Sequence, residues 1–425
     1  MMTTMQARVG TLLSIDTTQL QVLIDTLRNL GYRTIGPRIV DAAIVYGDLE
    51  SIDQLPVGYI DHQDGGRYRL EKPEGAGAGA GFFDYAVGPD SVKKFLYPPR
   101  ETLVESVRAD GSWVMKEAEI DPTSLAVIGM RSCDLHALAI QDQVFLGGPY
   151  VDPGYQARRQ NLFIVAVNCR RAAPTCFCHS MQTGPAVSGG FDLALTEVNQ
   201  HFVVEIGTPR GADVMAEIEC VPCDLQEVDE ARMISYTLEQ QLKKRDAKRV
   251  SNDDGKAPRE RTLDTSNIHD LLLGNLEHPR WAQVAERCLA CANCTMVCPT
   301  CFCASVEDVS DLGGDNVRRE RAWDSCFTAE HSYMNTGTVR KTTASRYRQW
   351  LTHKLATWID QYGTSGCVGC GRCITWCPVG IDLTEEVAAI RENKASAESG
   401  AVSGDPRTTE GDPRTTAAAS RGGQS

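Results

Sequence analysis

Two short cysteine runs near the C-terminus have the residue pattern with the clearest chemistry. Both read C-x2-C-x2-C-x3-C-P: Cys288, Cys291, Cys294 and Cys298 before Pro299, and Cys367, Cys370, Cys373 and Cys377 before Pro378. A cubane of four irons needs four converging thiolates. Two intervening residues let one loop bring three thiolates to three irons, and the three-residue step carries the fourth thiolate to a neighbouring cubane. The two runs therefore predict two 4Fe-4S clusters held close together, which suits electron transfer.

Structural zinc is the main alternative for these runs. Zinc takes one tetrahedral set of ligands, which usually comes from two C-x2-C pairs separated by a longer segment. The spacing found here is that of bacterial ferredoxin runs, in which the fourth cysteine ligates the other cluster. Two copies with identical spacing, each closed by a proline, favour iron–sulfur clusters over zinc.

Four further cysteines follow two short apolar runs, 125–130 and 161–167, that are typical of buried strands. They are Cys133, Cys169, Cys176 and Cys178. Binding sites in open α/β sheets form beyond the carboxyl ends of the strands, so these four thiols could meet there. Free cysteine is also a common small core residue. The four therefore predict either a third metal cluster or an inert or redox-only group.

The remaining cysteines give weaker signals. Cys220 and Cys223 form a lone C-x2-C, for which a structural or incidental role is favoured because no second pair follows. Cys301, Cys303 and Cys326 lie close to the first run and are open to three interpretations: ligands, neighbours of a cluster, or core residues. Spacing alone favours the eight cysteines of the runs as ligands.

The elements that must position these cysteines predict an α+β protein. Alternating short strands and helices favour a mixed α/β domain over residues 1–245, with a helix at 226–244 near its end. A polar segment at 246–266 is predicted to be a linker. Residues 267–393 are predicted to form a mainly α-helical, ferredoxin-like two-cluster domain, and the Ala/Ser/Gly/Thr-rich tail 394–425 is predicted to be disordered.

The segment between the two runs is predicted to be helical. Residues 305–308 resemble a capping box, and 344–362 have the periodicity of a long amphipathic helix. This segment is basic within an acidic protein, owing to Arg340, Lys341, Arg346, Arg348, His353 and Lys354. A solvated face is the simpler interpretation, and the functional alternative is charge compensation for the clusters or docking to an acidic partner.

Composition narrows the class of protein. The 425 residues have a formal net charge of -13, which does not favour binding to nucleic acid or to an anionic membrane surface. The 17 cysteines are clustered rather than spread as in a disulfide scaffold, which predicts a reducing compartment. Because no signal peptide and no apolar run of about 18 residues is recognised, a soluble cytoplasmic protein is expected.

No nucleotide fingerprint is recognised. The glycine-rich stretch at 75–81 lacks the lysine of a phosphate loop and is predicted to be a flexible insert. The isolated chain is therefore expected to bind no NAD(P)(H).

Six motifs together resemble a known family over about residues 85–390. They lie at 129–137, 168–169, 175–178, 298–303, 323–326 and 367–373. The set resembles the beta, iron–sulfur subunit of soluble, NAD(P)-linked NiFe hydrogenases of the sulfhydrogenase type. The electron-transfer subunit of anaerobic sulfite reductase is closely similar. The resemblance departs after Cys326, where a Gly-Gly-His-Asn-like stretch is expected and this chain differs.

The resemblance implies one component of a four-subunit enzyme. The large subunit would hold the nickel–iron site, the small subunit would hold a chain of clusters, and a flavin subunit would handle NAD(P)(H). By position, Cys288, Cys291, Cys294 and Cys377 would bind one cluster, and Cys367, Cys370, Cys373 and Cys298 the other. Electron transfer is the implied role, with no catalytic residue in this chain. The alternatives are the equivalent subunit of a sulfite reductase and, in a different class, an iron–sulfur redox sensor or scaffold.

Overall fold

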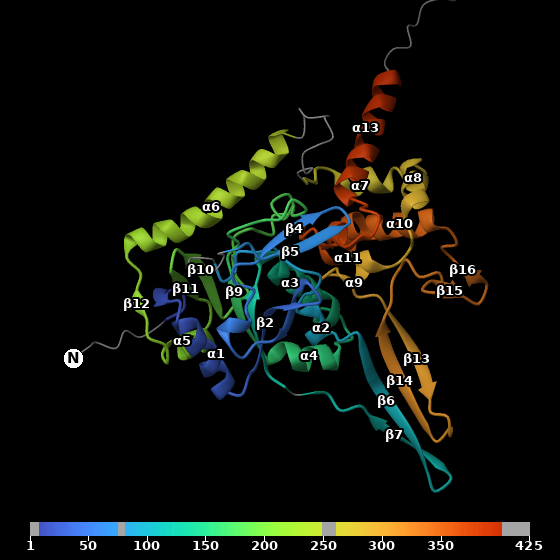
Figure 1. Cartoon of the computed structure of the whole chain (residues 1–425). Helices are drawn as coiled ribbons and strands as arrows, with labels where there is room; N and C mark the ends of the chain where they lie inside the picture. Colours follow the sequence, from blue (N-terminus) through green and yellow to red (C-terminus); the bar gives the residue numbers. More distant parts are fainter. Residues whose placement is uncertain (1–7, 75–80, 122, 249–260, 402–425) are drawn as a thin grey trace, which may run out of the picture.

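The computed structural model describes residues 8–74, 81–121, 123–248 and 261–401 (Figure 1). An eight-stranded sheet forms the centre of the N-terminal part, in the order β12-β1-β11-β10-β9-β8-β2-β3. Its strands are β1 (Leu12–Asp16), β2 (Arg33–Val40), β3 (Ala43–Asp48), β8 (Leu125–Met130), β9 (Leu162–Val167), β10 (Leu193–Val198), β11 (His201–Ile206) and β12 (Val221–Pro222). Neighbours from β2 to β10 run parallel, and the outer pairs are antiparallel. The predicted mixed α/β architecture is confirmed.

Helices cover both faces of this sheet, because every residue of β8 and β9 is buried and apolar. One face packs against α1 (Gln19–Asn29) and α5 (Pro209–Met215). The other packs against α2 (Lys93–Leu96), α3 (Ser132–Leu146) and α4 (Pro153–Gln160). Because β8 and β9 are parallel neighbours, the segments that follow them leave the sheet at the same edge.

A second, four-stranded sheet joins the two ends of the chain. Its order is β13-β14-β6-β7, all antiparallel, and Figure 1 shows it as an arm that extends away from the eight-stranded sheet. Its strands are β6 (Arg100–Ala109), β7 (Ser112–Glu117), β13 (Ala304–Ser310) and β14 (Asn316–Trp323). Since β6 pairs with β14, the segment between the two cysteine runs is held directly by the N-terminal part.

This arm corrects the prediction of a helix beginning at 305–308, which is a strand. The capping-box pattern is a local signal, and the cross-strand pairing of β13 with β14 overrides it. The prediction of a mainly α-helical second domain is therefore not confirmed. Two small hairpins add further strands, β4 (Ile60–Asp64) with β5 (Arg67–Glu71) and β15 (Tyr333–Met334) with β16 (Gly337–Thr338), and a short 3-10 turn, η1 (Ile52–Gln54), precedes the first.

The rest of the C-terminal part is built from short helices around one apolar core. They are α7 (Ile268–Leu273), α8 (Arg280–Arg287), α9 (Asn293–Met296), α10 (Thr343–Thr352), a π-helical turn η2 (His353–Thr357), α11 (Trp358–Tyr362), α12 (Arg372–Thr375) and α13 (Leu383–Ala401). The predicted helix over 344–362 is confirmed as the continuous α10–η2–α11 segment. Its Tyr347, Trp350, Leu351 and Leu355 are buried in the core.

The structure can be compared with the predicted element boundaries at some positions only. Helix α6 (Leu225–Lys248) confirms the helix predicted over 226–244. Residues 249–260 of the predicted linker and 402–425 of the predicted tail lie outside the described residues. Helix α13 continues to Ala401, beyond the end predicted at about 393, and the predicted domain and tail boundaries stay predictions. Among the described helices, none combines the length and apolar character needed to cross a membrane.

Candidate metal centre

Five cysteines line one cavity in the C-terminal part. Four of them are Cys288, Cys291 and Cys294 of the first run and Cys377 of the second, which we call set one, and the fifth is Cys373 of the second run. Burial raises the pKa of Cys294 well above its usual value, and the neighbouring Cys377 and Cys288 sulfurs raise it further. The structure therefore brings the fourth cysteine of the second run to the first run.

The rest of this cavity fits a sulfide-rich group. Apart from the cysteines, its lining is apolar or aromatic except for Asn293 and the polar ends of Tyr347 and Trp350. The hydroxyl of Tyr347 and the indole nitrogen of Trp350 are buried and have no hydrogen-bond partner in the described part of the chain. Buried donors are normally satisfied, and cluster sulfides are acceptors that could satisfy them.

The two cysteine runs fold into loops with the same backbone conformation. Ala290 and Ala292 have φ angles of 50° and 67°, and the residues at the same positions of the second run, Gly369 and Gly371, have φ of 63° and 76°. In each loop an amide points to the first sulfur, since Ala290 N and Gly369 N each lie 3.4 Å from the Sγ atom of their own run's first cysteine. Left-handed alanines are uncommon, so the matching geometry indicates a shared requirement to wrap the same object.

Set two consists of Cys367, Cys370, Cys373 and Cys298. Burial raises the pKa of Cys367 to about 12, with the Cys370 and Cys298 sulfurs adding to the effect. The pKa of Cys373 is raised by burial and by the same neighbours, with Cys294 of set one also close to it. Sets one and two are therefore adjacent, and each contains one cysteine from the other run.

Two buried lysines supply positive charge at set two. Lys354, from the π-helical turn η2, donates to Cys298 Sγ at 3.2 Å and to Thr300 Oγ1 at 3.1 Å. Lys93, from α2, donates to the carbonyl of Cys301 at 3.3 Å and lies over the Trp323 ring. Within the described residues neither ammonium has a carboxylate in ion-pair range, although both are over nine-tenths buried.

Buried cations are costly unless a negative charge lies nearby, and here the nearby groups are cysteine sulfurs. Contact with the Cys301 thiol, then the Lys354 charge and Thr300, holds the pKa of Cys298 well below its usual value. Although burial lowers the pKa of Lys354, the Cys298 and Cys301 sulfurs hold it well above its usual value. For Lys354, the geometry favours charge compensation over the solvated face.

Set three contains the four cysteines beyond the ends of β8 and β9, namely Cys133, Cys169, Cys176 and Cys178. Burial raises the pKa of Cys178 well above its usual value. The neighbouring sulfurs of Cys176, Cys169 and Cys370 raise this pKa further. Burial likewise raises the pKa of Cys133 well above its usual value, and nearby Asp134, Cys370 and Cys178 raise it further. The four predicted thiols thus come together, directly against Cys370 of set two. Set two is therefore next to both other sets, because Cys373 lines the cavity of set one and Cys370 packs with Cys133, Cys169 and Cys178 of set three. We call this arrangement, with set two between the other two sets, the row.

Buried arginines flank set three. Arg372 donates to Asp134 Oδ1 at 2.8 Å, and both side chains are 1% exposed. Its Nη1 has no nitrogen or oxygen partner in the described residues, and the sulfurs of Cys370 and Cys133 lie near it. Arg131 is also buried, donates to the carbonyls of Phe83 and Tyr85, and lies beside Cys169. These positive charges suit an anionic group at the junction of sets two and three.

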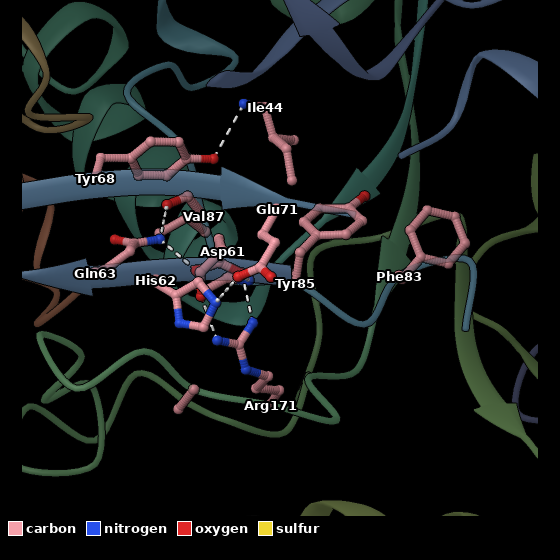
Figure 2. A network of polar contacts seen from close by, with 12 residues as sticks. Ile44, Asp61, His62, Gln63, Tyr68, Glu71, Phe83, Tyr85, Val87 and Arg171 are labelled. Atoms are coloured by element: carbon pink, nitrogen blue, oxygen red, sulfur yellow. Dashed lines mark hydrogen bonds and ion pairs between the residues drawn. The ribbon is translucent and has the colours of Figure 1, made fainter. Parts of the chain in front are cut away.

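A polar network connects the loop of set three to the second run. Asp61 of β4 is fully buried and accepts from Arg171 Nη1 at 2.6 Å and from Gln63 Nε2 at 2.8 Å (Figure 2). Gln63 in turn accepts from Thr375 Oγ1 at 3.0 Å, and Thr375 lies 2.9 Å from Thr175 Oγ1. Because Arg171 and Thr175 lie in the set-three loop, between Cys169 and Cys176, and Thr375 ends α12, the network fixes the loop relative to the second run.

Gly371 is expected to be sensitive to the smallest substitution. A Cβ there would lie 2.3 Å from the carbonyl oxygen of Thr175, whereas a Cβ at Gly363 would meet nothing within 4 Å. Both glycines have positive φ, so Gly363→Ala is a matched control for backbone strain. Gly371→Ala should destabilise the protein by about 1–3 kcal/mol more than the control and lower its iron content. Anaerobic denaturant titration checks this, and equal stability and iron content in the two variants would contradict the packing argument.

The other cysteines divide into two groups. Cys220 packs against the main core and Cys223 against a smaller apolar cluster, in keeping with a structural role. Cys303, by contrast, contacts the Cys326 thiol and the His331 ring, and these hydrogen bonds lower its pKa to about 4. Across the described residues, no three His, Cys, Asp or Glu side chains are spaced to hold a single metal ion.

Several groups at the site were not found from sequence. Arg131 and Asp134 lie in the motif at 129–137 and Arg372 lies in the motif at 367–373, but no role was predicted for these three side chains. Lys93 lies outside the motifs. The importance of all four depends on burial, which the sequence did not indicate.

Comparison with known proteins agrees with this geometry. Residues 287–381, which contain both runs, match the family described as 4Fe-4S dicluster domain. The chain is 32% identical over 308 residues to sulfhydrogenase 2 subunit beta of Pyrococcus furiosus, covering 71% of this chain and 82% of that protein. No solved structure matches the chain.

Proposed function

The chain belongs to the family of the sulfhydrogenase beta subunits, and from this we propose that it is the iron–sulfur electron-transfer subunit of a hydrogenase complex. It contains a 4Fe-4S dicluster domain and belongs to a family of hetero-oligomeric enzymes. The observation that supports the proposal most strongly is the row of three cysteine sets, in which Cys373 lies at the cavity of set one and Cys370 packs against set three. Adjacent redox centres in a row are what electron transfer across a protein requires.

The proposed ligands follow the exchange of fourth cysteines. Set one (Cys288, Cys291, Cys294 and Cys377) holds one 4Fe-4S cluster, and set two (Cys367, Cys370, Cys373 and Cys298) holds the other. When bound, the clusters supply one-electron redox chemistry. The chain's own residues orient the thiolates, exclude water through the aromatic lining of set one, and offset negative charge through Lys354 and Arg372.

Set three is proposed to hold a third cluster. Its support is the convergence of Cys133, Cys169, Cys176 and Cys178 at one edge of the sheet, beside the buried Arg131 and Arg372. We propose that a mixed α/β domain at 1–245 holds this third cluster and that a second domain at 267–393 holds the other two. Residues 246–266 are proposed to link the two domains.

Replacing Cys133 and Cys178 together by alanine tests the third cluster. The full chain, purified anaerobically, should lose about four irons and four sulfides relative to the unsubstituted chain, because two of the four ligands are removed. The control is Cys220→Ala with Cys223→Ala, which removes two thiols from apolar packing and should leave the iron content unchanged. An iron content unaffected by the Cys133 and Cys178 replacements would rule out the third cluster.

The proposed partners are a nickel–iron large subunit, a small subunit with its own clusters, and a flavin subunit that handles NAD(P)(H), in a reducing cytoplasmic compartment. The complex without this chain should lose hydrogen-dependent reduction of the external acceptor but retain hydrogen–deuterium exchange at the large subunit. Retention of acceptor reduction without the chain would refute the electron-transfer role. Co-purification of the tagged chain with a siroheme protein instead of a nickel protein would point to the sulfite reductase alternative.

A further inference from the structure

The tetrapeptide Thr-Cys-Phe-Cys occurs twice in this chain, at 175–178 and at 300–303. Both threonines are fully buried and hydrogen-bonded to the second run or to the residue directly before it. Thr175 Oγ1 lies 2.9 Å from Thr375 Oγ1, and Thr300 Oγ1 donates to the carbonyl of Gly366 at 2.7 Å. The first copy carries two cysteines of set three. The second copy, with Cys301 and Cys303, is anchored in a comparable way, and the proposed electron-transfer row does not use its cysteines.

Two more metal-binding side chains lie at this second copy. Strand β14 ends opposite the start of β13, where Trp323 pairs with Ala304 and Asp324 N donates to the Cys303 carbonyl at 2.9 Å. This pairing carries the chain on to Cys326 and His331. The Cys303 sulfur lies near both the Cys326 thiol and the His331 ring.

His331 is oriented in the way that a metal-binding histidine usually is. Its Nδ1 lies 2.7 Å from Asp324 Oδ2, and both side chains are largely buried. A carboxylate on Nδ1 fixes the proton on that nitrogen and leaves Nε2 free to bind a metal, the arrangement common around metal-ligating histidines. Asp324 is therefore a positioning residue for His331.

The buried positive charge around the second copy also favours an anionic group there. Lys93 contacts the Cys301 carbonyl from a buried position, and the buried Lys354 donates at 3.1 Å to Oγ1 of Thr300, the residue before Cys301. Cys301 contacts Cys298 of set two, and Cys326 lies near Cys294 of set one. The second copy thus lies beside sets one and two. It also lies beside Lys93 and Lys354, which form no ion pair with a carboxylate among the described residues.

We propose that Cys301, Cys303, Cys326 and His331 form an additional metal centre that takes an iron–sulfur cluster. The three thiols give up their protons on binding, and the imidazole binds neutral. In the described part of the chain no three such groups are spaced for one ion, and a cluster of two or more irons accepts ligands that are farther apart. This centre is additional to the three sets of the proposed row, and it lies next to sets one and two.

Replacing Cys303 and Cys326 together by alanine in the full, anaerobically purified chain tests the centre. Loss of about two to four irons with matching sulfide is expected, while the Cys220 and Cys223 replacements leave both contents unchanged. An unchanged iron content in the Cys303 and Cys326 variant overturns the proposal, and so does the loss of one zinc without sulfide. Because the Cys133 and Cys178 variant reports on set three alone, failure here leaves the proposed electron-transfer row standing.

His331 gives a second test that does not depend on removing two cysteines. His331→Cys should keep the iron content and lower the midpoint potential of one cluster, because histidine ligands raise cluster potentials relative to cysteine. His331→Ala should weaken the centre and reduce the iron content. Potentiometric titration followed by EPR measures both effects. Identical iron content and identical potentials in His331→Ala, His331→Cys and the unsubstituted chain would overturn the role of His331.

Discussion

Alanine in place of both Cys367 and Cys370 is expected to stop electron transfer through the chain, even though most other ligands remain. These two residues supply half of set two, which lies between sets one and three. Electron tunnelling rates fall steeply with distance, so removing the middle centre separates the outer ones. The variant should also lose about four irons, since two of four cluster ligands are gone.

This expectation is measured in the assembled complex. Hydrogen-dependent reduction of the external acceptor should fall to background, while hydrogen–deuterium exchange at the large subunit continues. The double replacement of Cys220 and Cys223 is the matched control, because it removes two cysteines with the same C-x2-C spacing from apolar packing. Normal acceptor reduction in the Cys367 and Cys370 variant would show that set two is not on the electron path.

Lys354→Met is expected to lower the midpoint potential of one cluster by on the order of 100 mV. The ammonium lies 3.2 Å from Cys298 Sγ in a fully buried position. Removing a positive charge disfavours the added electron, and an interaction of about 2–3 kcal/mol at an effective dielectric constant of ~20 corresponds to that shift for a one-electron couple. Methionine keeps much of the side-chain volume, so packing is largely preserved.

Lys341→Met is the matched control for charge, because Lys341 lies in the same basic segment but is exposed. Its effect on the potential should be small, since solvent screens an exposed charge. The two variants are compared by EPR-monitored redox titration of the anaerobically purified chain. Equal potentials for Lys354→Met and the unsubstituted chain would contradict charge compensation by Lys354.

The sequence predicted the grouping of thiols well where the signal was topological. Cys133 and Cys169 follow strands whose apolar residues are continuous, and parallel neighbours in a sheet must release their chains at one edge. The matching backbone conformation of the two cysteine loops could likewise be expected from their identical spacing. Glycine stands at 369 and 371 because the Thr175–Cys178 loop packs there, while alanine suffices at 290 and 292.

The prediction failed where tertiary contacts decide. The capping-box pattern at 305–308 gave no hint of β13, because that strand exists through pairing with β14, which in turn pairs with β6 about 200 residues earlier. Lys354 could not be told from the other basic residues of its segment, since only burial in the π-helical turn sets it apart. The contact of His331 with Cys303 depends on the same arm and had no sequence signal.

The content of iron, acid-labile sulfide and zinc in the full chain, purified anaerobically, tests the central claim most directly. Two clusters held by the two runs predict at least about eight irons and eight sulfides per chain, and sets beyond the runs add to that number. Iron and sulfide should be close to equal, and zinc should be absent. Stoichiometric zinc without sulfide would contradict the account.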